Sequence, residues 1–191
     1  PTRRSSDLAA AVSITVGPAP LTIRANDAAK VYGAPLPAFT ASSAGFVNGD
    51  TSASLIGTLT FSTTASQTSA PGTYVVTPGG VSSANNTLAF QSGTVTVTKA
   101  ATTMTLSASP SPSPNNKPVT LSATIGVVTP GMGVPTGSVE FRDKGVLLGT
   151  APLVNGGASL TVPFRKGSHP LTAAWSGDSN LTGSNAAITH Q

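Results

Sequence analysis

The stretch from Pro135 to Val162, PTGSVEFRDKGVLLGTAPLVNGGASLTV, decides the fold class. Val139 and Phe141 alternate with polar residues, so an extended strand here would bury one face and expose the other. Asp143-Lys144-Gly145 supplies one hairpin turn, and Asn155-Gly156 supplies a stronger one because both residues tolerate a positive φ. The stretch therefore predicts strands over residues 136–142, 145–154 and 157–163.

Similar short runs, rich in valine and threonine and bounded by glycine or proline, continue on both sides of this stretch. No long segment has the period of an amphipathic helix, so the chain is predicted to be all-β. A short helical turn is expected over Asp50–Leu55, because Asp50 suits an N-cap. Further strands are predicted over residues 20–26, 38–44, 57–63, 72–78, 86–91 and 93–99, and over 102–108, 118–125, 169–175 and 185–191.

Two segments each carry a series of family motifs. Between Leu21 and Ala100 the chain holds LTIRAND, VYGAPLPAF, GFVNGDT, GTLTFS, PGTYVVTPGGVSSANNTLAF and GTVTVTKA, and this segment resembles the MBG repeat of the YGX type. Between Thr102 and Ser184 it holds TTMTLSASPSPSPNNKPVTLSATI, PTGSVEFRDKGVLLGTAPL, NGGASLTV and GSHPLTAAWSGDSNLTGS, and this segment resembles a bacterial Ig-like repeat. The resemblances imply two tandem small β-modules, the second an Ig-like β-sandwich and the first a β-sandwich or a β-grasp-like module.

The expected division gives an MBG-like module over residues 18–99 and an Ig-like domain over 100–191, whose last strand is expected to be truncated. The junction Lys99-Ala100-Ala101 is short, which favours a semi-rigid rod. Residues 1–8, PTRRSSDL, resemble a translated sequencing adapter, and residues 9–17 are interpreted as the last strand of a preceding repeat. The run SPSPSP, Ser109–Pro114, is expected to be a loop of the second module in preference to a polyproline ligand.

Composition excludes several classes of function. Charged residues make up only 8% of the chain, and no basic stripe interleaved with aromatic residues is present, so no nucleic-acid partner is expected. No apolar run approaches the roughly 20 residues needed to cross a bilayer, so no membrane insertion is expected. Cysteine is absent, which excludes disulfides, thiol nucleophiles and cysteine-bound zinc.

The chain is also poor in groups for catalysis. Apart from Asp7, the acidic residues are expected in turns or on outward faces, where they cannot converge as an acid–base pair. His169 and His190 have no acidic neighbour at metal-ligand spacing. No G-x-S-x-G elbow occurs, and glycines 79–80 and 131–133 do not precede a helix that could bind phosphate. The five acidic residues in question are Asp27, Asp50, Glu140, Asp143 and Asp178.

The sequence therefore predicts no enzyme, no catalytic or cofactor-binding residue and no metal site. Calcium stays the less favoured alternative, because no D-x-[DN]-x-[DN]-G run is present. Arg165-Lys166 beside His169 is interpreted as a solvated turn, with contact to an anionic glycan as the alternative. The lysines read as loop or strand-end residues, which argues against the Lys–Asn isopeptide bonds of some surface Ig-like modules. These lysines are Lys30, Lys99, Lys117, Lys144 and Lys166.

Two aromatic positions are assigned to structure. Leu171 and Ala173 share the period-2 face of Trp175, which predicts that Trp175 packs in the core. Gly33, after Tyr32, fits a tight turn with a positive φ, and this pair is expected to fix the fold rather than to form a site.

The function that the resemblances imply is a structural spacer or stalk in an adhesin-like protein at the bacterial cell surface or secreted from the cell. Its partners would be the neighbouring repeats of the same chain. One alternative is a module that binds extracellular glycan or protein, and another is an accessory domain of a secreted carbohydrate-active enzyme. The residues considered for a binding rim, which do not cluster in sequence, are Tyr32, Phe46, Tyr74, Phe164 and Arg165.

Overall fold

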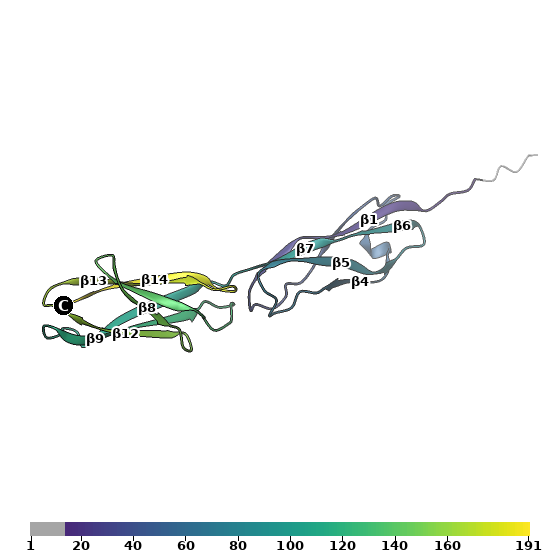
Figure 1. The fold of residues 1–191 in the computed structure, drawn as a ribbon. Coiled ribbons are helices and arrows are strands. Elements are labelled where there is room, and N and C mark those ends of the chain that lie inside the picture. Colours follow the sequence, from purple (N-terminus) through teal and green to yellow (C-terminus); the bar gives the residue numbers. More distant parts are fainter. Residues whose placement is uncertain (1–13) are drawn as a thin grey trace, which may run out of the picture.

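The computed structural model describes residues 14–191 and confirms the all-β prediction. Within that part the strands form two elongated modules that lie end to end, β1–β7 in one and β8–β14 in the other (Figure 1). The adapter-like residues 1–8 and most of the expected preceding strand lie outside the described residues. Residues 14–17 belong to no strand, and the side chains of Ile14 and Val16 are exposed.

The first module is a sandwich of two sheets. Their facing sides bury Leu21 and Ile23 of β1, Val76 of β5, and Val95 and Val97 of β7, at the period of two that strands require. The β-grasp-like alternative needs a helix packed across a sheet, and residues 14–99 contain no helix longer than the 3₁₀ turn Ser52–Ser54. One sheet has the order β3 (Ala41–Ala44), β1 (Ala19–Ala25), β6 (Asn86–Gln91), and the other β2 (Ala28–Val31), β7 (Gly93–Thr98), β5 (Gly72–Ser82), β4 (Ile56–Thr63).

The pairing within these sheets is mixed. β1 pairs in parallel with β6, and β2 pairs in parallel with β7, while the remaining neighbours are antiparallel. Strand β2 was not predicted, because four residues that include a lysine carry too weak a strand signal. The predicted N-cap at Asp50 is wrong: Thr51 caps the 3₁₀ turn, and its Oγ1 accepts from the backbone N–H of Ala53 at 3.3 Å. Asp50 instead accepts from Ser54 Oγ at 3.1 Å.

The second module is the predicted Ig-like sandwich, and all seven expected strands are present. Both expected turns have a positive φ at their two central residues, 49° and 82° for Lys144-Gly145 and 50° and 80° for Asn155-Gly156. Lys144-Gly145 closes a hairpin as predicted, whereas the hairpin predicted at Asn155-Gly156 is wrong: the strands on its two sides lie in different sheets and meet only in the Val154–Gly157 bridge. One sheet has the order β11 (Val146–Pro152), β10 (Ser138–Asp143), β13 (His169–Gly177), β14 (Thr182–His190), and the other β12 (Gly157–Phe164), β9 (Lys117–Val127), β8 (Thr102–Ser109).

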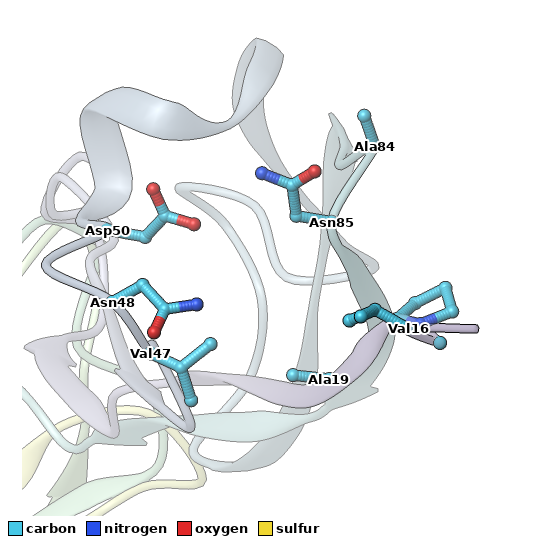
Figure 2. Close-up of a pocket in the computed structure, with 9 residues that line it drawn as sticks. Val16, Ala19, Val47, Asn48, Asp50, Ala84 and Asn85 are labelled. Carbon is cyan, nitrogen blue, oxygen red and sulfur yellow. The ribbon is translucent and has the colours of Figure 1, made fainter. Parts of the chain in front are cut away.

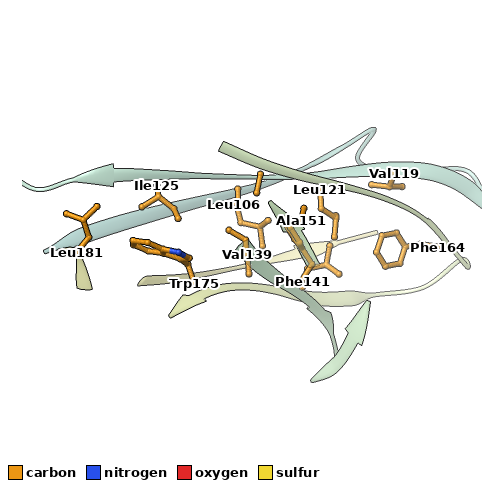
Figure 3. Close-up of a cluster of buried hydrophobic side chains, with 14 of the residues drawn as sticks. Leu106, Val119, Leu121, Ile125, Val139, Phe141, Ala151, Phe164, Trp175 and Leu181 are labelled. Atoms are coloured by element: carbon orange, nitrogen blue, oxygen red, sulfur yellow. The ribbon is translucent and has the colours of Figure 1, made fainter. Parts of the chain in front are cut away.

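The core of the second module contains large side chains from both sheets (Figure 3). Leu121, Phe141 and Leu171 are fully buried. Trp175 is 3% exposed, and its indole N–H donates to the carbonyl oxygen of Thr136 at 2.9 Å, which confirms the prediction of a core tryptophan. The described part of the first module, by contrast, buries no aromatic side chain fully, so its core is the smaller of the two.

Candidate functional site

A cleft of about 520 Å³ lies at the end of the first module where β1 begins (Figure 2). Val47, Asn48 and Asp50 form one wall, and Ala84 and Asn85 form the other. The residues that line it include a single ionisable group and no aromatic ring. It therefore lacks the paired carboxylates that acid–base catalysis uses and the ring on which a sugar could stack.

Asp27 and Asp178 hold turns in place. Asp27 Oδ1 accepts from the backbone N–H of Thr94 at 2.8 Å and from its hydroxyl at 3.0 Å, and these bonds lower the pKa of Asp27. Asp178 accepts from the N–H groups of Asn180, Leu181 and Thr136 and from the Thr136 hydroxyl. Burial raises the pKa of Asp178, but these four bonds together hold it below the usual value.

Asp143 has a partner that the sequence did not indicate. It ends strand β10, its side chain is only 17% exposed, and its Oδ2 lies 2.6 Å from Nδ1 of His169. The prediction that no carboxylate adjoins either histidine is therefore wrong. The expected hairpin turn is present, since Lys144 and Gly145 follow Asp143 directly, and the Asp143 side chain has a structural role beside His169. The pair arises because β10 and β13 are neighbours with Asp143 opposite Leu171, a cross-strand relation that spacing along the chain does not show.

His190 lies beside this pair at the far end of the second module. It is fully buried, its Nε2 lies 2.9 Å from Ser113 Oγ, and its Nδ1 lies 3.2 Å from Ser111 Oγ. Burial, and then the neighbouring His169, lower the pKa of His190. The serines contact one histidine and Asp143 the other, so no single imidazole links a serine to a carboxylate as a catalytic triad requires.

The remaining predicted candidates do not gather at one place. Phe164 is buried and packs against both imidazole rings, with centroid distances of 4.7 Å to His169 and 5.3 Å to His190. Tyr74 packs against the core of the first module, whereas Tyr32 packs against the core of the second. Glu140 pairs with Arg142 at 2.8 Å on an exposed face. Within residues 14–191 no three histidine, aspartate or glutamate side chains come together as a metal site would need.

Lys30 also differs from its expected environment. It lies within strand β2 and is buried, with 7% of the residue exposed, and burial lowers its pKa. Its ammonium donates to the carbonyl oxygens of Ala34 at 2.8 Å and Gln67 at 3.0 Å. Both partners are backbone atoms, so the arrangement does not resemble an isopeptide precursor, in which the amine faces a side-chain amide.

Several solved structures match this chain over most of its length but share little sequence with it. They include the fibronectin(III)-like modules of Clostridium thermocellum CbhA (13% identity, covering 85% of this chain and 87% of that one, TM-score 0.39). They also include the Yersinia pseudotuberculosis adhesin InvE (16% identity, covering 90% of this chain and 58% of that one, TM-score 0.37). A third is the structure of the FN1-FN3 domains of chicken CNTN1 (8% identity, covering 93% of this chain and 67% of that one, TM-score 0.30). With TM-scores this low, the three likenesses carry no argument about function.

Comparison with family models identifies both modules. No curated protein matches the chain in sequence. No helix in the part of the chain that the structure describes has the length and apolar character needed to cross a bilayer. Residues 21–96 match the model of the MBG domain (YGX type), and residues 104–191 match that of the bacterial Ig-like domain (group 3). The chain is therefore a tandem of an MBG domain of the YGX type and a bacterial Ig-like domain of group 3.

Proposed function

We propose that this tandem is a structural spacer in an adhesin-like protein that bacteria display on the cell surface or secrete. The observation that carries the proposal is the continuity of β-structure between the modules. Strand β7 ends at Thr98 and β8 begins at Thr102, and Ala100 between them pairs in parallel with Leu181. A chain that passes between sandwiches without a free linker keeps them in line, which is what a stalk requires.

In this proposal residues 18–99 form one domain and residues 100–191 form the other. The partners of the tandem are the neighbouring repeats of the same chain. The proposal includes no catalytic residue, cofactor or metal. Asp27 and Asp178 support this because backbone N–H groups donate to their carboxylates, and Asp143 supports it because its Oδ2 is paired with His169. Both domain families are typical of extracellular bacterial proteins, and an extracellular location is part of the proposal.

A display experiment tests the proposed function. The chain is placed between a bacterial surface anchor and a small affinity domain, and capture of a bulky bead through the affinity domain is measured. We expect capture to improve with one copy of the tandem and further with two, and to fall when Trp175→Ala unfolds the Ig-like module. Binding of the isolated tandem to members of a glycan or host-protein array would contradict a passive spacer and favour the binding-module alternative.

A further inference from the structure

A turn of the MBG module meets a loop of the Ig-like module. The turn is Tyr32–Gly33, directly after β2, and the loop is Gly131–Gly133, between β9 and β10. The backbone N–H of Met132 faces the carbonyl oxygen of Tyr32 at 3.4 Å. The tyrosine ring packs against the core of the Ig-like module, although Tyr32 belongs to the other module. This contact is therefore made across the joint by both backbone and side chain.

Glycine is required at the closest point of this contact. Gly33 has a φ of 85°, and a Cβ at this position would overlap the main chain and the Cβ of Met132. Gly131 is equally confined, since a Cβ there would lie 2.5 Å from the Cβ of Ala100 in the linker. Real Cβ atoms do not approach other atoms so closely, so each glycine lets two segments of backbone touch.

The MBG module supports the turn from behind. The buried ammonium of Lys30 joins Ala34, beside the turn, to Gln67 in a separate loop. The Gln67 side chain donates to the carbonyl oxygen of Gly33 at 2.7 Å, and it also lies 3.4 Å from the sulfur of Met132. A buried lysine without an acidic partner is costly to fold, and here it fixes the two segments that face the other module.

The linker provides a second, separate attachment. The N–H of Ala100 donates to the Asn180 carbonyl at 3.0 Å, and the N–H of Thr182 donates to the Ala100 carbonyl at 2.9 Å. The Lys99 ammonium donates to the carbonyl oxygen of Asp178. A linker attachment alone would leave the modules free to rotate about it. Two attachments at different points on the same end of the Ig-like module remove that rotation.

We propose that the Tyr32–Gly33 turn is a docking element whose partner is the Gly131–Gly133 loop of the following Ig-like module. The Tyr-Gly pair then forms an interaction surface between modules, which goes beyond the fold-fixing role expected from the sequence. The proposal rests on the spacer function and adds how the spacer acquires a fixed bend and twist at this joint. It also assigns a purpose to the buried Lys30, which neither core uses.

Distances between spin labels test the docking in the full chain. The chain has no native cysteine, so Ser62→Cys on β4 and Ser159→Cys on β12, both exposed, give one label in each module. A second pair of labels, at Ser159 and Ser176, lies within the Ig-like module and serves as the reference. Its distance distribution has the width that the flexibility of the labels alone produces. We expect the pair across the joint to show a single distance as narrow as the pair within one module.

The decisive variant is Gly33→Ala, and Gly49→Ala is its matched control. Gly49 has nearly the same φ, 83°, but a Cβ there would meet nothing within 4 Å. Both variants carry the same backbone strain, and only Gly33→Ala collides with Met132. We expect Gly33→Ala to broaden the distribution across the joint and Gly49→Ala to leave it narrow. Gln67→Ala, which has no strain of its own, is expected to broaden it as well.

Each outcome decides the proposal. A broad distribution in the unmodified tandem would overturn the docking, and so would narrow distributions in both folded Gly33→Ala and Gln67→Ala. If Gly33→Ala fails to fold while Gly49→Ala folds, Gln67→Ala alone decides. None of these results depends on bead capture or array binding, so failure of the docking and failure of the spacer function are distinguishable.

Discussion

Trp175 is the residue on which the Ig-like core depends most. Removing the buried indole leaves a cavity, and the carbonyl oxygen of Thr136 loses the hydrogen bond that it accepts from the indole N–H. We expect Trp175→Ala to lower the free energy of unfolding by about 3–5 kcal/mol. Urea titration followed by circular dichroism measures this loss. The control is Val154→Ala, whose side chain is 68% exposed, and an equal loss in both variants would contradict the core role.

His190 makes the stability of the Ig-like module depend on pH. Burial and the adjacent His169 lower the pKa of His190 in the folded state. Below the ordinary histidine pKa of 6.5, the unfolded chain therefore binds a proton at His190 more readily than the folded chain does. The free energy of unfolding should therefore decrease as the pH falls through 6.5 towards the lowered folded pKa. Asp27 and Asp178 have lowered pKa values and lose their contributions only near and below 3.8, which separates the two windows.

The variant His190→Gln removes this titration and serves as the test. Unfolding titrations of wild type and variant at several pH values should show a decrease below pH 6.5 in the wild type and a smaller one in the variant. Parallel curves for the two proteins would contradict the assignment of the dependence to His190. The sequence could not point to this cluster, because register between strands brings Asp143, His169 and His190 together.

Among the elements, the two-residue turns are those that local sequence specifies. Lys144-Gly145 and Asn155-Gly156 were predicted as turns and adopt positive φ as expected, because their backbone demand is local. Strand β2 was missed because its pairing with β7, far along the chain, defines it.

The Asn155-Gly156 turn gives a prediction at this scale. A β-branched residue in the left-handed region that Asn155 occupies, with a φ of 50°, costs about 1–2 kcal/mol. Asn155→Val should therefore destabilise the Ig-like module by that amount in thermal or urea unfolding. Ser159→Val, at an exposed and extended position of the strand that follows the turn, should have little effect or stabilise slightly. If Asn155→Val leaves the free energy of unfolding unchanged, the turn does not restrain β12.

At the scale of the whole molecule, the two cores differ in size and should unfold separately. The Ig-like module buries Phe141, Phe164 and Trp175, whereas the described MBG module buries no aromatic side chain to this extent. Circular dichroism should therefore show two transitions in urea, while the fluorescence of Trp175 follows only the second. Coincident transitions by both probes would show that the docked joint makes the tandem one cooperative unit.

Two tandem β-modules and their order could be predicted from sequence, because motif order and alternation are local properties. The contact of Tyr32 with the Ig-like core could not, since nothing near Tyr32 in the chain indicates which module its ring faces. The sequence does not indicate the burial of Lys30 either, because its two carbonyl partners, Ala34 and Gln67, are far apart in the chain and meet only when the MBG module has folded.

The parallel pairing in the MBG module has a mechanical consequence. Its first strand, β1, is bonded in parallel to β6, and its last strand, β7, is bonded in parallel to β2. Tension applied through the two ends of the module pulls each terminal strand lengthwise against its partner. The ladder is then loaded in shear, so its hydrogen bonds share the force, whereas the bonds of a hairpin pulled open from its ends break one at a time. A module with a small core can in this way resist stretching more strongly than its resistance to urea would suggest.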